Sequence, residues 1–353
     1  MITIGVDAHK RIHVAYAVDE AGREISQWRG PNSPSGWRQL FSWAGEVRGE
    51  RQWGIEGAWS YGRNLAQFLV GAGETVFDVN PRWTAFGRRR GRRPAKSDSL
   101  DARAVALVVR QEAPTLPRVN ADDETVILDL LTTERNQAIS DATRLRNQIH
   151  SLLTQIDPEY TLRLPTLKSK AGLAALHTYS PPDDRRPLQV ERAAVVRRLA
   201  QRLQLAVDQA EELAKRIKEL VGPRFVPLTR LCGVDLLTAG ALAGVLGPGL
   251  RFRTDAQLAA YAGVAPLEAS SAGLVRHRLN RGGNRRLNAI LYMIVLAQAR
   301  HLQEARAYLD RRVAEGKSRR EAMRALKRFV IRAIWRNWQD CQLPVANPVA
   351  AVA

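Results

Sequence analysis

The first 118 residues alternate between strand and helix signals, and the order of these signals restricts the fold more than any other feature. Short β-branched or alternating runs predict five strands, at 2–6, 13–18, 24–28, 53–56 and 75–79. Segments with apolar residues on one face predict helices at 35–47 and 63–70. Three strands followed by helix, strand, helix and strand predict an α/β domain with a mixed sheet.

Four carboxylates stand at informative places in this predicted domain. Asp7 closes the first strand and Glu56 closes the fourth. Asp98 and Asp101 follow the N-cap of a helix predicted at 97–109, and their spacing of three residues places both on one helix face. The helix dipole favours acids in a first turn, which is a purely structural alternative for this pair.

The functional interpretation is that all four carboxylates converge on two divalent ions. Hard oxygen ligands suit Mg²⁺ or Mn²⁺, and ions about 3.5–4 Å apart clamp the attacking and leaving oxygens in phosphoryl transfer. Without a metal, the clustered carboxylates would repel one another. The six histidines are scattered, and His9 and His13 are interpreted as ordinary polar positions.

Basic residues give the chain a formal net charge of +19. A charge this large repels itself unless a polyanion neutralises it, so a nucleic-acid partner is expected. One cluster precedes the 97–109 helix and comprises Arg88, Arg89, Arg90, Arg92, Arg93 and Lys96. A second surrounds a Gly-Gly-Asn turn and comprises Arg276, Arg278, Arg281, Arg285 and Arg286. We expect both to contact phosphates, with a solvated surface as the alternative.

Residues 122–157 and 190–222 change to heptad spacing. The first run steps by four and three through Ala138, Ala142, Leu145, Ile149, Leu152 and Ile156. A Pro-rich, basic connection at 164–188 joins the two runs, which therefore predict an antiparallel helix pair. The apolar seam either mediates self-association, as a dimer or tetramer, or packs within one chain.

The rest of the chain predicts a mainly α C-terminal domain. Segment 231–248 has a glycine turn between two apolar helices, the pattern of a helix-hairpin-helix that presents N–H groups to a phosphate. The expected regions are an α/β catalytic domain, a helical coiled-coil region, the C-terminal domain and a disordered tail, at 1–118, 119–222, 223–341 and 342–353. No signal peptide precedes the first strand and no apolar stretch is long enough for a bilayer, so a cytoplasmic, nucleoid-associated protein without a membrane partner is expected.

The segments that carry the acids resemble a known family. GVDAHK, GIEGAWSYG and KSDSLDARAVA are similar to the three acidic motifs of the DEDD transposases of the IS110 insertion-sequence family, which also includes the Piv invertases. The stretch from LCGVDLLTAG through YAGVAPLEASS to HRLNRGGNRRLN resembles the family's second domain. The resemblance implies a RuvC-like domain of the RNase H fold, with Asp7, Glu56, Asp98 and Asp101 as catalytic metal ligands.

The family's second domain carries a serine that looks like the nucleophile for a covalent link to DNA. Ser271 matches it, and Ser270 is the alternative because Ala272 replaces the usual following glycine and Gly273 comes one place late. The resemblance implies a transposase that cleaves and rejoins donor and target DNA, guided by a noncoding RNA. Ordinary loop serines are the structural alternative.

Three other functions stay open at this point. A purely hydrolytic RuvC-like nuclease, such as a junction resolvase, would need the four acids but not Ser271. A catalytically inactive nucleic-acid-binding protein would need neither, and the presence of all four acids argues against it. An actin-like sugar kinase shares the sheet topology but requires a Gly-rich phosphate loop, which AHKRIH does not supply.

Overall fold

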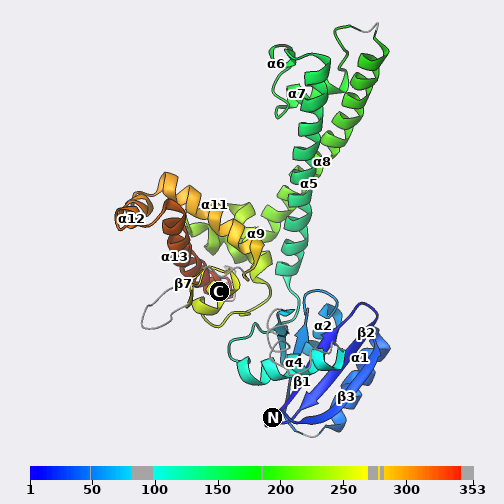
Figure 1. The fold of residues 1–353 in the computed structure, drawn as a ribbon, viewed down its shortest axis with the longest axis vertical. Coiled ribbons are helices and arrows are strands. Elements are labelled where there is room, and N and C mark those ends of the chain that lie inside the picture. Colours follow the sequence, from blue (N-terminus) through cyan, green and yellow to red (C-terminus); the bar gives the residue numbers. More distant parts are fainter. Residues whose placement is uncertain are drawn as a thin grey trace, which may run out of the picture. The chain divides into compact units, whose positions relative to one another are not determined.

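A computed structural model describes most of the chain: residues 1–47, 49–81, 84, 98–183, 186–268, 277–278 and 282–342. It divides into two compact units (Figure 1). One unit comprises 1–126, 224–234 and 245–353, and the other comprises 127–223 and 235–244.

The N-terminal part of the first unit contains a mixed sheet, as predicted. Its strands are β1 (Ile2–Ala8), β2 (Ile12–Val18), β3 (Glu24–Pro31), β4 (Arg51–Glu56) and β5 (Val76–Val79). Their order is β3-β2-β1-β4-β5. The first three strands form antiparallel pairs, whereas β1 with β4 and β4 with β5 are parallel. The parallel strands therefore end at the same edge of the sheet.

Both faces of the sheet are covered by helices. Because alternate side chains of a strand point to opposite faces, Ile4 and Val6 share one face. That face packs on α1 (Pro34–Glu46) and α2 (Arg63–Gly71) in one hydrophobic cluster. The other face is covered by α4 (Asp98–Glu112), whose alanines pack on β2.

The backbone of α4 comes very close to the sheet at two glycines. A Cβ at Gly5 would lie 2.2 Å from both Ala102 O and Ala106 N on α4. Gly54 is the partner of Gly5 in the register of β1 and β4, and a Cβ there would lie 2.3 Å from a valine side chain of the same helix. The residue two places after each glycine is an acid on this same face.

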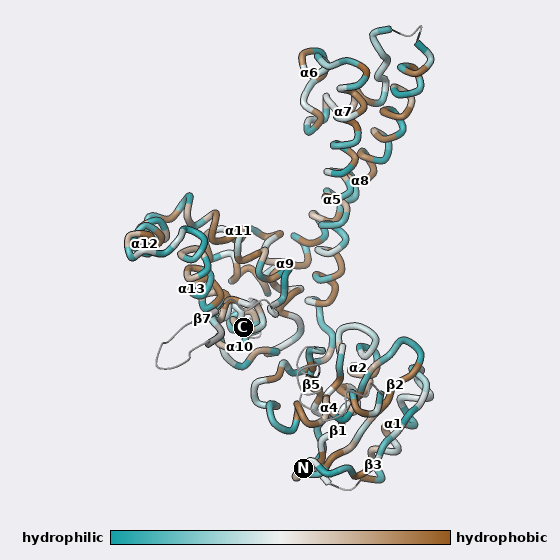
Figure 2. The backbone as a smooth tube through the Cα atoms, in the orientation of Figure 1, coloured by the Kyte–Doolittle hydropathy of each residue, from teal (hydrophilic) through white to brown (hydrophobic). Residues whose placement is uncertain are grey.

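The second unit contains a long helical hairpin. Its helices are α5 (Glu124–Ile156), α6 (Tyr160–Arg163), α7 (Lys170–His177) and α8 (Pro187–Phe225), followed by α9 (Leu236–Leu246). The first residues of α5 and the last of α8 belong to the first unit. Figure 1 shows α5 and α8 side by side in opposite directions, and Figure 2 shows apolar residues along both.

The heptad positions of α5 are used within one chain. Ala142, Leu145 and Ile149 lie in a hydrophobic cluster with residues of α8. After Ile149 the structure buries Leu153 completely, while the predicted Leu152 and Ile156 are partly buried and pack against the same cluster. A straight α-helix has 3.6 residues per turn, so a strict 3.5-residue seam drifts off the buried face.

The C-terminal part of the first unit is mainly α, as expected. Its elements are η1 (Val226–Arg230), α10 (Asp255–Tyr261), β6 (Leu267–Glu268), β7 (His277–Arg278), α11 (Arg285–His301), α12 (Gln303–Ala314) and α13 (Arg319–Asp340). Within 231–248 the structure has one helix, α9, so the two apolar helices predicted for this segment are not both present. A glycine turn at Gly233, with φ of +89°, precedes α9, and a five-residue 3₁₀ helix with a proline in its first turn precedes Gly233. In the described part of the chain, no helix is both long and apolar enough to cross a membrane.

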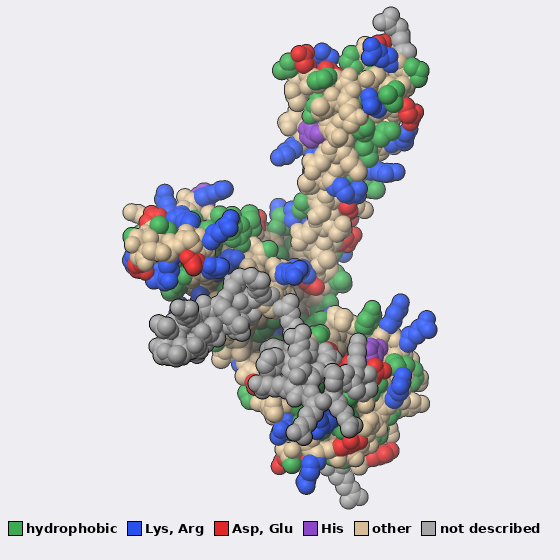
Figure 3. Space-filling view, viewed as in Figure 1, with side chains coloured by type: hydrophobic (Ala, Val, Ile, Leu, Met, Phe, Trp, Pro, Cys, Tyr) green, Lys and Arg blue, Asp and Glu red, His purple; other side chains and the backbone are tan. Residues whose placement is uncertain are grey.

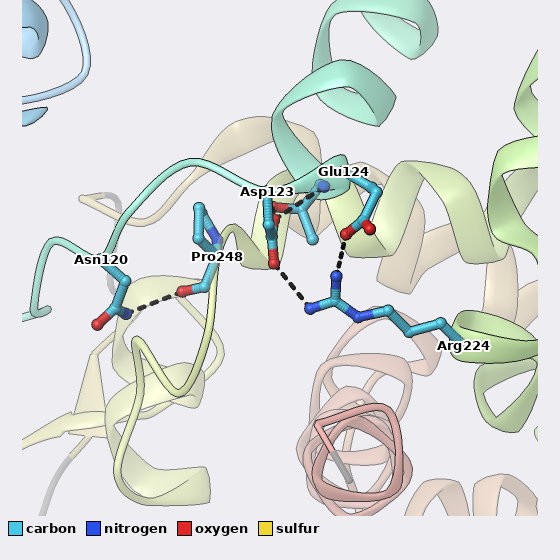
Figure 4. Close-up of polar contacts among 6 residues, drawn as sticks. Asn120, Asp123, Glu124, Arg224 and Pro248 are labelled. Carbon is cyan, nitrogen blue, oxygen red and sulfur yellow. Dashed lines mark hydrogen bonds and ion pairs between the residues drawn. The ribbon is translucent and has the colours of Figure 1, made fainter. Parts of the chain in front are cut away.

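Passages of the chain that are far apart in sequence meet where α5 begins. Arg224, near the end of α8, donates from Nη2 to Asp123 Oδ2 at 2.7 Å and also pairs with Glu124 (Figure 4). Asn120 Nδ2 donates to the carbonyl of Pro248 at 2.9 Å. Arg224 is about 100 positions from Asp123 and Glu124 in the sequence. These contacts therefore join the two points at which the chain leaves the first unit and returns to it.

The close approach of α4 gives a test of the fold. Gly5→Ala should lower the free energy of unfolding by about 1–3 kcal/mol, because its methyl group meets helix backbone that cannot move aside. Gly45→Ala in α1, where a Cβ meets open space, should instead raise it by about 0.5–1 kcal/mol. Urea unfolding measures both, and a Gly5→Ala midpoint equal to that of the native chain would contradict this packing.

Candidate metal centre

Asp7 and Glu56 lie side by side at the ends of two parallel strands. They are direct partners in the register of β1 and β4, as the sequence predicted. Asp7 is only 6% exposed. The Thr84 hydroxyl donates to Glu56 Oε1 at 3.0 Å and so orients this carboxylate.

The other two acids come from the helix that covers this face. Asp98 and Asp101 are both in the first turn of α4, and Asp101 is buried, with 5% exposure. The negative charges of Glu56, Asp101 and Asp98 all raise the pKa of Asp7. The structure therefore brings together the four acids that were selected from the sequence.

His9 is a further member of this cluster that the sequence interpretation missed. It lies in the turn after β1, and its Nε2 atom is 3.1 Å from Asp7 Oδ2 and 3.6 Å from Asp98 Oδ1. Ligand atoms of Asp7, His9 and Asp98 all lie within 4.8 Å of one another. The only sequence signal was its position two residues after a strand-end acid.

The electrostatics of Asp7 favour a bound cation. The pKa of Asp7 is raised to about 6: burial is the largest cause, the charges of Glu56, Asp101 and Asp98 also raise it, and His9 lowers it. Asp7 Oδ2 is buried and accepts no hydrogen bond from any described residue. Its close neighbour His9 Nε2, at 3.1 Å, belongs to a half-exposed side chain. A divalent ion would compensate the buried negative charge more fully. A cluster dominated by carboxylate oxygens suits a hard divalent cation.

The predicted nucleophiles and most of the predicted basic contacts lie outside the described residues. These are Ser270, Ser271, Arg88, Arg89, Arg90, Arg92, Arg93, Lys96, Arg276 and Arg281. Arg278 is in β7, of which only the backbone is described. Arg285 and Arg286 form the first turn of α11, whose N-cap Asn284 accepts a hydrogen bond from Leu287 N. The antiparallel pair β6–β7 lies on either side of the serines in the sequence.

The C-terminal helices carry more exposed basic residues than the sequence analysis selected. Besides Arg285, the exposed arginines on α11, α12 and α13 are Arg300, Arg306, Arg311, Arg319, Arg320, Arg324, Arg332 and Arg336. Figure 3 shows basic side chains gathered on these helices. Several of them pair with nearby acids, such as Arg319 with Asp310 and Arg332 with Asp255 of α10, so only part of this charge is free to attract a polyanion.

The raised pKa of Asp7 predicts how the metal-free protein responds to pH. Because the pKa rises from 3.8 to about 6 on folding, the protonated form stabilises the folded state, and this stabilisation is lost as pH rises from about 4 through 6. Two pKa units correspond to about 3 kcal/mol as an upper limit. In chelator at pH 7.5, Asp7→Asn should therefore unfold at higher urea than the native chain, and the gap should shrink towards pH 4.5.

Asp208→Asn, which changes an exposed carboxylate on α8, is the matched control and should leave the midpoint nearly unchanged. If Asp7→Asn is no more stable than the native chain at pH 7.5, the ionised carboxylate of Asp7 does not destabilise the folded state, and its pKa is not raised.

Two family models match the chain in sequence order. A model described as "Transposase", of the IS110 DEDD class, matches residues 4–158 and so includes all four acids. A model described as "Transposase IS116/IS110/IS902 family" matches residues 227–310, which include Ser270 and Ser271.

Curated relatives match along nearly their whole length. A 43.6 kDa protein of insertion element IS110 from Streptomyces coelicolor is 27% identical and covers 96% of this chain and 94% of the relative. A 44.8 kDa protein of insertion element IS116 from Streptomyces clavuligerus is 25% identical and covers 100% of this chain and 98% of the relative. A 42 kDa protein of insertion element IS900 from Mycobacterium paratuberculosis is also 25% identical, with 95% of each chain covered.

Among solved structures, T. thermophilus RuvC in complex with a Holliday junction substrate aligns with 15% identity and a TM-score of 0.28, over 34% of this chain and 100% of that chain. The family assignment rests on the sequence matches, which cover both the acidic and the C-terminal segments. The chain belongs to the IS110 family of insertion-sequence transposases and is a DNA recombination enzyme.

Proposed function

We propose that this transposase cleaves and rejoins strands of donor and target DNA with a metal-bound acidic tetrad and a serine nucleophile. The single observation that carries the first half is the meeting of Asp7, Glu56, Asp98 and Asp101 at one end of the sheet. The sheet order and the helix on its acidic face support a RuvC-like, RNase H-type domain.

The four acids would hold Mg²⁺ or Mn²⁺, and His9 is placed to act as a further ligand. A bound divalent ion would supply Lewis-acid stabilisation of the phosphoryl oxygens. The chain's own residues prepare this site. Asp7 offers a buried oxygen that accepts no hydrogen bond from any residue in the described ranges, and Thr84 holds Glu56 by a hydrogen bond.

Ser271, with Ser270 as the alternative, is our proposed nucleophile. Its Oγ would form a bond to phosphorus, the bond from phosphorus to the leaving sugar oxygen would break, and the hydroxyl proton would pass to a base. The resulting ester keeps the free energy of the broken bond, so the strand can be rejoined by the reverse attack of a sugar hydroxyl. The acids act from the same chain or from a second copy.

The two arginine clusters, one before α4 and one after the serines, would bind nucleic acid. We propose that Arg88 to Lys96 and Arg276 to Arg286 contact phosphates, and that the glycine turn at Gly233 adds backbone N–H donors in the manner of a helix-hairpin-helix. The net charge of +19 also suits a guide RNA. DNA as substrate implies action at the bacterial nucleoid.

Self-association as a dimer or tetramer is part of the proposal, because recombination joins two pairs of DNA ends. The buried seam of α5 and α8 is already used within the chain, so a coiled coil between copies would need their exposed faces. Those faces include the large apolar residues Leu130, Ile139 and Leu205.

Replacing each serine tests the covalent step. With metal, element-end DNA and copurified RNA, Ser271→Ala should abolish both recombination and a protein–DNA adduct that survives denaturant, because only the serine can form the ester. Ser270→Ala, made in parallel, should retain both activities. If only Ser270→Ala removes the adduct, the nucleophile is one residue earlier. If neither variant matters and free-ended nicks appear, the enzyme is a hydrolytic nuclease.

Replacing His9 tests the composition of the metal site. An imidazole nitrogen favours Mn²⁺ over Mg²⁺, so His9→Asn should weaken Mn²⁺ binding by about tenfold and Mg²⁺ binding much less. Titration calorimetry at pH 7.5 measures both affinities. Asp98→Asn should weaken the binding of both ions. His301→Asn, which changes an exposed histidine at the end of α11, should leave both affinities unchanged. An unchanged Mn²⁺ affinity in His9→Asn would exclude it as a ligand.

A further inference from the structure

The first unit contains a buried arginine that joins the sheet to the C-terminal helices. Arg251 follows α9 and is 5% exposed. Its Nη2 donates to Asp78 Oδ2 at 3.0 Å, and these residues are 173 positions apart. Asp78 is on β5, where its register partner on β4 is Ile55, the residue before Glu56.

Three aromatic rings surround the same guanidinium group. Its central carbon lies 4.8 Å from the ring centroid of Tyr261, 4.9 Å from that of Trp59 and 5.2 Å from that of Phe252. Trp59 comes from the loop after β4, and Tyr261 is the last residue of α10. Only a planar cation can stack on such rings and still donate to a carboxylate, so lysine would not replace it fully.

Tyr261 in turn holds the described ends of the segment that carries the two serines. Its carbonyl accepts from Asn284 N at 2.7 Å, and its hydroxyl accepts from Asn284 Nδ2 at 2.8 Å. One helical turn after Asn284, Asn288 Nδ2 donates to the carbonyl of Ala262, the residue after Tyr261, at 2.9 Å. Hydrogen bonds therefore join the residues before the serine-bearing segment, Tyr261 and Ala262, to those after it, Asn284 and Asn288.

These contacts form one continuous path from the strand beside Glu56 to the base of the serine-bearing segment. It runs through Asp78, Arg251, Tyr261 and Asn284. Buried ion pairs contribute little net stability compared with apolar residues of the same volume, but their directional bonds can select one arrangement. Burial raises the pKa of Asp78, and Arg251 opposes this, as expected for a carboxylate that depends on its partner.

We propose that Arg251 is a positioning residue, which fixes the base of the serine-bearing segment relative to the acidic centre. The geometric part stands on the contacts above, and the link to catalysis rests on the proposed function. Among the described residues, Arg251 has no hydrogen bond or ion pair with Asp7, Glu56, Asp98 or Asp101. It acts by reducing the range of positions that Tyr261 and Asn284 can adopt.

The test measures position and chemistry separately in the full-length chain. Spin labels on cysteines introduced at Gln39 and Arg306, both exposed, report the distance distribution between α1 and α12 by pulsed electron resonance. The native Cys232 and Cys341 are replaced by alanine in every sample. Adduct yield on element-end DNA and divalent-ion affinity are measured in parallel.

Three variants and a control are compared. Asp78→Asn combined with Arg251→Met removes both charges, so neither is left buried alone and the chain can fold. Tyr261→Phe keeps the ring and loses only its hydroxyl contacts. Arg251→Lys tests partial rescue by charge. Arg253→Met is the matched control, because Arg253 is exposed two residues further on.

The double variant should broaden the distance distribution and lower adduct yield by at least about tenfold, because small misplacements of reacting groups have large effects on rate. Divalent-ion affinity should stay unchanged. Tyr261→Phe and Arg251→Lys should lie between the double variant and the native chain, and Arg253→Met should equal the native chain.

A folded double variant with a distribution as narrow as that of the native chain would overturn the inference, whatever its adduct yield. If the double variant does not fold, the same comparison with Tyr261→Phe decides. If the native chain forms no adduct, the proposed serine chemistry fails, and the distance distributions still decide whether Arg251 positions the segment.

Discussion

The contact between β1 and the backbone of α4 at Gly5 is the constraint on which the rest of the site depends. A side chain at this position would collide with Ala102 and Ala106, so only a hydrogen atom separates strand and helix. Because side chains alternate along a strand, the residue two places on points to the same face. That residue is Asp7, and the helix held there presents its acids from its first turn. The close packing of β1 on α4 therefore brings Asp7 next to the acids in the first turn of α4.

That cluster is electrostatically unfavourable without a cation, which is typical of functional sites. Asp7 is buried, has one oxygen without a donor among the described residues, and has a pKa raised to about 6. Hydrophobic packing on both faces of the sheet holds the acids in place against their repulsion. The same divalent ions that would relieve the repulsion would supply the chemistry of phosphoryl transfer. Family models match both the segment with the acids, residues 4–158, and a C-terminal segment, residues 227–310, so both parts belong to the same family of transposases.

Local periodicity predicted the strands and helices of the N-terminal domain because each is amphipathic in its own right. The four acids could be selected because strand ends and helix first turns are local features. His9 was missed, since the direction of a side chain in a turn has no periodicity. The Arg251–Asp78 pair could not be predicted either, because it joins positions 173 residues apart and no local pattern marks it. Leu153 is buried more fully than the predicted Leu152, because the seam follows the true helical repeat.

If the acidic cluster binds a divalent ion, Asp7 must give up its proton to the solvent when the ion binds. Calorimetric titration with Mn²⁺ in two buffers of different ionisation enthalpy measures the protons released per bound ion. With a pKa of about 6, Asp7 is half protonated at pH 6, so binding should release about half a proton there and almost none at pH 8. Performing the titration in His9→Asn as well removes the imidazole from the count. Binding at pH 6 without proton release in either protein would contradict the account.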